Sequence, residues 1–76
     1  MTIKILGSGC AKCKQLEKNT IEAVNNLNLK ADIIKVEDFE EIMSYEIMST
    51  PALVVDEKVL STGKLLKPAE IEQLLQ

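Results

Sequence analysis

Several residue types are missing or scarce in this chain of 76 residues, and each absence narrows what the protein can do. There is no histidine and no tryptophan, and there is one phenylalanine and one tyrosine. Without histidine, the chain lacks the usual general base, the commonest metal ligand and any Cys/His nucleophilic pair. With so few aromatic rings, it also lacks the platforms on which nucleic-acid bases stack. We therefore expect its chemistry to depend on cysteine.

Positive charge and long apolar runs are also scarce. Nine basic residues against 12 acidic ones give a net charge of −3, the wrong sign for neutralising the phosphates of a nucleic acid. The longest apolar run, residues 52–55, is far shorter than the roughly 20 residues of a membrane-spanning helix. Residues 1–6 contain a lysine and lack the apolar stretch of a secretory signal. We expect a cytoplasmic monomer that binds neither nucleic acid nor membranes.

The apolar content, 46% of the residues, is enough for one small core. A chain of this length buries only about 60% of the surface that it exposes when unfolded. We therefore expect a single domain, residues 1–76, with a thin core of aliphatic side chains.

Hydrophobic periodicity divides the first half of the chain into strand, helix and strand. Residues 1–6 alternate Ile3 and Ile5 with polar neighbours, which is typical of a strand. From Cys10 the apolar positions recur every three or four residues, which predicts a helix to about Asn26. Residues 31–36 are rich in β-branched side chains and predict a second strand.

A second, shorter helix is predicted after this strand. Asp38 can cap it, and its apolar positions Phe39, Ile42 and Met43 continue to Ile47 at steps of three and four. We expect Met43 and Met48 to fill the core rather than to touch a substrate. The acidic cluster of residues 37, 38, 40 and 41 is expected to be a solvated helix start.

The last third predicts a hairpin followed by a closing helix. Residues 52–55 form a continuous apolar run, as expected for a strand that is covered on both faces. Residues 56–58 predict a tight turn into a strand over residues 59–61. Pro68 suits the first position of a helix whose apolar stripe contains Ile71, Leu74 and Leu75. The resulting order, βαβαββα, predicts an α/β fold with a four-stranded mixed sheet and flanking helices.

Cys10 and Cys13 form a CxxC motif at the start of the first helix, directly after Gly7, Ser8 and Gly9. Side chains three residues apart on a helix are about 5 to 6 Å apart at Cβ, so a reversible disulfide needs little backbone movement. Cys10 lies where free N–H groups and the helix dipole stabilise a thiolate, which makes it the expected nucleophile. Cys13 lies on the apolar stripe and is the expected resolving thiol. Lys12 adds positive charge that is expected to lower the pKa of Cys10 further.

Two other interpretations of the cysteine pair remain open at this point. One is a buried pair with no chemical role, although the cytosol rarely supports a purely structural disulfide. The other is a metal site, because soft thiolates suit Cu(I). Zinc is less suited, since two thiolates and no histidine leave a four-coordinate site half empty.

The complete pattern resembles the minimal thioredoxin fold, and it looks closest to small archaeal and bacterial redox-active disulfide proteins. The residues that carry the resemblance are the GSGCAKC segment around Cys10 and Cys13, and the segment from Thr50 and Pro51 to Asp56. The resemblance implies a cis Thr50–Pro51 bond that faces the cysteines, with the Thr50 backbone alongside an extended substrate. One departure is Lys4, which stands where thioredoxins carry a buried proton-accepting acid.

We therefore expect a thiol-disulfide oxidoreductase that reduces protein disulfides through a mixed disulfide and needs no cofactor or metal. Its expected partners are a disulfide-containing protein or small thiol, and a reductase or thiol donor that restores the dithiol. The alternative is a carrier of Cu(I) or another soft metal. Copper carriers of this size resemble a βαββαβ plan that ends in a strand, whereas this sequence predicts a terminal helix.

Overall fold

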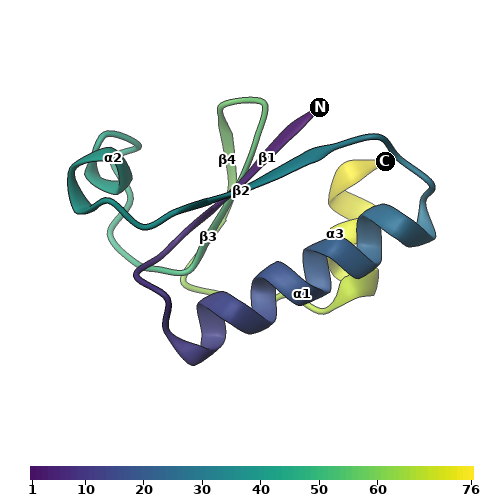
Figure 1. The fold of residues 1–76 in the computed structure, drawn as a ribbon, viewed down its shortest axis with the longest axis horizontal. Helices are drawn as coiled ribbons and strands as arrows, with labels where there is room; N and C mark the ends of the chain where they lie inside the picture. The colour runs from purple at the N-terminus through teal and green to yellow at the C-terminus, as the bar shows by residue number, and fades with distance from the viewer.

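The computed structural model describes all residues 1–76, and its seven elements follow the predicted order (Figure 1). The strands are β1 (Thr2–Leu6), β2 (Asp32–Val36), β3 (Ala52–Val55) and β4 (Lys58–Thr62). The helices are α1 (Ala11–Asn26), α2 (Phe39–Met43) and α3 (Pro68–Leu75). The predicted α/β architecture is confirmed. No helix has the length and apolar composition that crossing a membrane requires.

The four strands form one mixed sheet in the order β2-β1-β3-β4. β1 runs parallel to β2 and antiparallel to β3, so that Ile3 lies between Ile33 and Val55. β4 is antiparallel to β3, with a register shift beside Leu53 and Val54. The parallel pair is the arrangement that a right-handed crossover through α1 produces.

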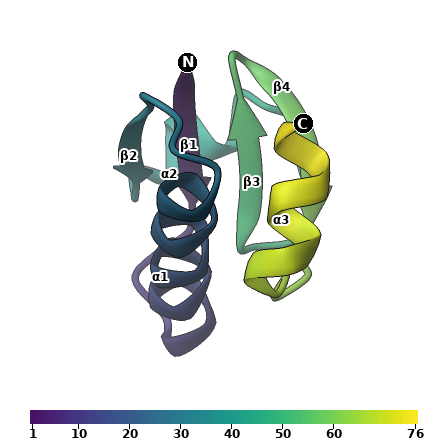
Figure 2. The same ribbon diagram turned by 90° about the vertical axis from the view of Figure 1, so that its right-hand side faces the viewer.

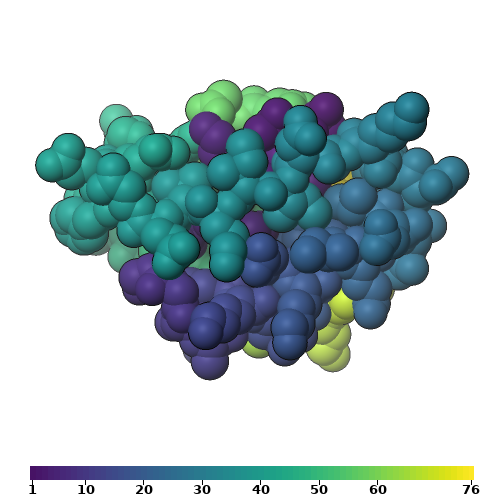
Figure 3. All heavy atoms as spheres, viewed as in Figure 1, coloured from purple at the N-terminus to yellow at the C-terminus, as the bar shows by residue number.

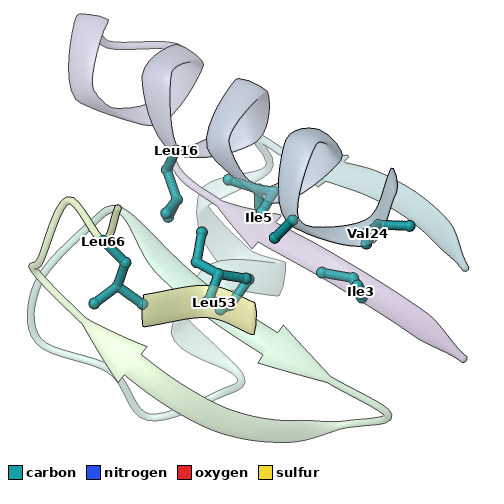
Figure 4. Close-up of a cluster of buried hydrophobic side chains, with 8 residues drawn as sticks. Ile3, Ile5, Leu16, Val24, Leu53 and Leu66 are labelled. Atoms are coloured by element: carbon teal, nitrogen blue, oxygen red, sulfur yellow. The ribbon is translucent and has the colours of Figure 1, made fainter. Parts of the chain in front are cut away.

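The helices cover the two faces of the sheet unequally. α1 and α3 lie side by side on one face, and α2 lies on the opposite side (Figure 2). The larger core cluster lies between the sheet and helices α1 and α3. Ile5, Leu16, Leu53 and Leu66 converge in it (Figure 4). The smaller cluster joins α2 and the following segment to the sheet, and contains Leu6, Val36, Ile42, Ile47, Ala52 and Val54.

Two features favour a helix in α1: its apolar stripe and its capping residues. Its buried residues are Cys13, Leu16, Thr20, Ala23 and Val24, which repeat at steps of three, four, three and one. The one polar member, Thr20, donates its hydroxyl to the carbonyl of Leu16 at 2.7 Å, so no polar group is left unpaired on this stripe.

The region after β2 differs from the prediction. α2 ends at Met43, so Ile47 lies beyond it, although Ile47 is buried as expected for an apolar position. Ser44 caps the helix and Glu46 adopts a positive φ of 58°, which stops its continuation. The expectation that Met43 and Met48 fill the core is wrong, because both are exposed. A five-residue helix is little more than one turn and presents one buried side chain, Ile42, to the sheet.

Two smaller corrections concern the C-terminal third. The hairpin turn consists of Asp56 and Glu57 alone, both with positive φ, and Lys58 already belongs to β4. This two-residue geometry matches the right-handed twist of the paired strands. Leu74 was expected on the buried stripe of α3 but is 44% exposed, because only Ile71 of that helix reaches the core fully.

Candidate functional site

Cys10 and Cys13 occupy different environments at the start of α1. Cys10 is the N-cap residue, with extended backbone angles, and its side chain is exposed. Cys13 lies one turn later on the buried stripe and is only 5% exposed. The backbone N–H of Cys13 donates to Cys10 Sγ at 3.3 Å, which is the N-cap hydrogen bond of the helix. The cap of the helix is therefore a thiol rather than a hydroxyl or carboxylate.

The environments shift the two thiol pKa values in opposite directions. The pKa of Cys10 is lowered, first by a hydrogen bond with the Cys13 side chain and then by the Cys13 backbone N–H. The pKa of Cys13 is raised, first by burial and then by the hydrogen bond with the Cys10 side chain. Only a thiolate attacks a disulfide, and the two shifts favour the thiolate form of Cys10 over that of Cys13.

Gly7 brings Cys13 and Pro51 together, a role that the sequence did not reveal. A Cβ at residue 7 would overlap with Cys13 Sγ and would lie 3.9 Å from Pro51 Cα. The backbone at Gly7 therefore fills the narrow space between the buried thiol and the Pro51 loop, where no side chain fits. The sequence signal was the glycine between the first strand and the CxxC motif, but the close approach becomes visible only in the folded chain.

The Thr50–Pro51 peptide bond is cis, as predicted. Pro51 is fully buried, and its carbonyl accepts a hydrogen bond of 2.8 Å from the backbone N–H of Gly63. Thr50 is exposed and lines a groove that also contains Ser8, two residues before Cys10. Gly7 thus lies between Pro51 and the Cys13 sulfur, whereas Thr50 is linked to the cysteine segment through the groove that it shares with Ser8.

Lys12 is exposed in the first turn of α1. Its backbone N–H contributes to the lowered pKa of Cys10. The effect of its ammonium group on Cys10 stays a prediction.

Lys4 is directed away from the thiols. Its ammonium donates to Glu57 at 2.7 Å and to the Tyr45 hydroxyl at 2.8 Å. It does not line the small cavity at Cys13, whose volume is about 60 Å³. The charged side chains that do line this cavity are Lys14, Lys35 and Glu37. The only carboxylate beside the buried thiol is therefore that of Glu37, which the sequence had placed in a solvated helix start.

The arrangement defines a class of protein. Two thiols with opposite pKa shifts, at the start of a helix that follows the first strand of a parallel βαβ unit, can form and break a disulfide with little movement. No group of three or more His, Cys, Asp or Glu side chains is placed to hold a metal ion. The class is a disulfide oxidoreductase of the thioredoxin fold.

Comparisons with known proteins agree with this class. A family model described as a thioredoxin domain matches residues 1–76. A thioredoxin from Methanothermobacter thermautotrophicus is 36% identical over 75 residues, which cover 99% of this chain and 97% of that protein. A thioredoxin from Methanocaldococcus jannaschii is 36% identical over 76 residues, which cover 100% of this chain and 87% of that protein.

The chain belongs to the thioredoxin domain family and is a thioredoxin-like disulfide oxidoreductase. The predicted family is thereby confirmed. The alternative of a metal carrier finds no support in these relatives, and the chain ends in helix α3 rather than in the strand of the copper-carrier plan.

Proposed function

We propose that this protein reduces protein disulfides, with Cys10 as the nucleophile and Cys13 as the resolving thiol. The observation that carries the proposal is the contrast between the two sulfurs. Cys10 is exposed with a lowered pKa, and Cys13 is buried with a raised pKa. An exposed thiolate can reach a disulfide on another protein, whereas a buried thiol can react only with a sulfur already bound next to it.

The reaction balances in two exchanges. Cys10 thiolate attacks one sulfur of the substrate disulfide, a Cys10–substrate disulfide forms, and the other substrate sulfur leaves as a thiolate that takes up a proton from water. Cys13 then loses its proton and attacks Cys10 Sγ, and the second substrate sulfur leaves as a thiolate. The substrate gains two electrons, and the protein is left with a Cys10–Cys13 disulfide. A reductase or a thiol donor must return two electrons before the next turnover.

Two features of the site support this division of labour. The Cys13 N–H donates to Cys10 Sγ, so the sulfur that is attacked in the second exchange already lies beside the attacking residue. Thr50 lines a groove together with Ser8, two residues before Cys10, and an extended substrate segment can lie there. The proposed roles of Thr50 and Pro51 are to position that segment.

A single-turnover experiment tests the proposal. Reduced protein, freed of excess dithiol, is mixed with a fluorogenic pair of peptides joined by a disulfide. We expect the wild-type protein to release about one equivalent of peptide thiol pair per chain and to finish as an internal disulfide. Cys10→Ser should release none above the uncatalysed background. Release by Cys10→Ser at the wild-type rate would overturn the assignment.

A further inference from the structure

We propose that the groove lined by Ser8 and Thr50 docks an apolar segment of the substrate protein that is flanked by Lys or Arg. This inference rests on the proposed function and specifies its substrate class. The docking groove has a volume of about 260 Å³. It is lined by Ser8, Phe39, Ile42, Met43, Ile47, Met48, Ser49 and Thr50.

The docking groove exposes large apolar side chains that the fold does not use. Met48 is 98% exposed and Phe39 is 73% exposed, and Met43 between them is half exposed. Phe39 is the only phenylalanine of the chain, and two of its three methionines line this one groove. Such a concentration on a small protein marks an interaction surface, and methionine adapts to partners of different shape.

The position of the docking groove links it to the chemistry. Two of its lining residues adjoin the reactive segments: Ser8 lies two residues before Cys10, and Thr50 precedes the buried Pro51. The α2 segment lies beside the loop that leads into α1 at the same end of the molecule (Figures 1 and 3). A chain seated in the groove therefore contacts the loop that leads to Cys10.

Charge selects the partner. Residues 37–50 contain five acidic side chains and no Lys or Arg, so this segment carries −5 in a chain whose net charge is −3. The acidic residues are Glu37, Asp38, Glu40, Glu41 and Glu46. All five are exposed, and they belong to the same segment of the chain as the apolar side chains of the groove. Complementary positive charge on a partner would speed its association and fix its orientation.

The same charge argues against a second copy of this chain as the occupant. Pairing two identical faces would bring two segments of charge −5 together, and like charges in an interface cost free energy. A substrate segment with basic flanks meets both the apolar and the acidic parts of the docking groove. The occupant is therefore a partner protein rather than another protomer.

The test compares two disulfide peptides with the same apolar centre, one flanked by lysines and one by glutamates. We expect kcat/KM of the wild-type protein to be about tenfold or more higher for the lysine-flanked peptide at low salt. The preference should shrink strongly at 1 M salt, where charges are screened within about 3 Å. Each rate is divided by that protein's own rate on a small aromatic disulfide, which reports Cys10 chemistry alone.

Variants separate the two contributions. Glu41→Lys combined with Glu46→Lys should abolish or reverse the preference, and Phe39→Ser combined with Met48→Ser should raise KM several-fold for both peptides. The matched controls are Glu22→Lys on α1 and Leu74→Ser on α3. Both residues are exposed and lie outside the docking groove, so both controls should behave as wild type.

The outcomes distinguish the two proposals. Failure to react with the small disulfide would reject the proposed function. Normal reaction with it, but equal kcat/KM for the two peptides at low salt, would reject the docking inference alone. Sedimentation showing a wild-type dimer that Phe39→Ser with Met48→Ser dissociates would assign the groove to a second copy and would also overturn the inference.

Discussion

Gly7 leaves no room for a side chain beside Cys13, because a Cβ at residue 7 would overlap with the Cys13 sulfur. Gly7→Ala must therefore push the thiol or the Pro51 loop aside. We expect the free energy of unfolding to fall by about 1 to 3 kcal/mol, the usual cost of overpacking a buried site. Closure of the Cys10–Cys13 disulfide should also slow, because a displaced Cys13 sulfur is no longer aligned with the Cys10 sulfur.

Urea denaturation and the rate of disulfide closure check this prediction. Ser8→Ala is the matched control, since Ser8 is the exposed neighbour in the same loop and should change stability little. Wild-type stability together with wild-type closure in Gly7→Ala would show that the contact is not tight.

Lys12 provides a second prediction at this scale. Replacing it with Glu removes a positive charge near Cys10 and adds a negative one, so the pKa of Cys10 should rise. Lys12→Ala should give a smaller rise, and 1 M salt should reduce both. Thiolate absorbance followed against pH measures the effect. An unchanged Cys10 pKa in Lys12→Glu at low salt would mean that only the backbone N–H of residue 12 acts on the thiol.

The chemistry-bearing residues were visible in the sequence, and their neighbours were not. The spacing of Cys10 and Cys13 predicts a redox pair, and the resemblance to the thioredoxin fold implies the cis bond at Pro51. Gly7 matters through its contact with Cys13, and Glu37 through a cavity that it shares with that thiol. Both depend on how the end of β1 faces α1 and on where β2 ends beside it, which local periodicity does not specify.

At the scale of secondary-structure elements, Lys4 joins three segments. From β1 it contacts Glu57 in the β3–β4 turn and Tyr45 after α2, and the Tyr45 hydroxyl also donates to Glu57 at 3.0 Å. These contacts lower the pKa of Glu57, chiefly through the hydrogen bond from Lys4, and raise the pKa of Lys4. A group whose pKa is depressed on folding stabilises the folded state above its ordinary pKa.

The pH dependence follows from that sign. The contribution of Glu57 is present above its ordinary value of 4.5 and is lost as the pH falls below it. Glu57→Gln should therefore be less stable than wild type at pH 7, and the difference should shrink by pH 3. Urea denaturation at both pH values measures it, with Glu41→Gln as the control that leaves Lys4 unaffected. A stability difference that is equal at pH 7 and pH 3 would contradict the role of the ion pair.

The elements themselves were predicted well where periodicity was long. α1 and the strands follow from repeats of apolar or β-branched residues, and α1 runs to Asn26 as expected. α2 was predicted too long, because Ile47 keeps the spacing although the helix stops at Met43. The helix does not continue because Glu46 has a positive φ, and nothing about a glutamate in the sequence indicates that conformation.

For the whole molecule, the core is thin, with 18 of 76 residues buried. Leu53 on the central strand β3 is fully buried in the larger cluster. Leu53→Ala should lower the free energy of unfolding by about 2 to 5 kcal/mol, a large part of the roughly 5 to 15 kcal/mol of a typical domain. Leu74→Ala, at an exposed position of α3, should cost much less. Similar urea midpoints for the two variants would contradict the assigned core.

The strand pairing of the sheet could be predicted from the order of the elements, whereas the exposed apolar side chains could not. A βαβ unit and a hairpin predicted the parallel and antiparallel pairs of the sheet. The exposure of Phe39 and Met43 could not be foreseen, because apolar residues at helical spacing normally face a core. Only Ile42 of the short helix α2 is buried, so the other apolar side chains of the helix stay exposed.

The most direct test of the central claim is the capture of the intermediate. Reduced Cys13→Ser and Cys10→Ser are each mixed with a disulfide-linked peptide pair, quenched with acid and mapped by mass spectrometry. The account predicts that Cys13→Ser accumulates a stable disulfide between Cys10 and one peptide, because the thiol that resolves it is gone. Cys10→Ser should accumulate little, since Cys13 is buried with a raised pKa. Equal accumulation at Cys13 in the Cys10→Ser variant would contradict the account.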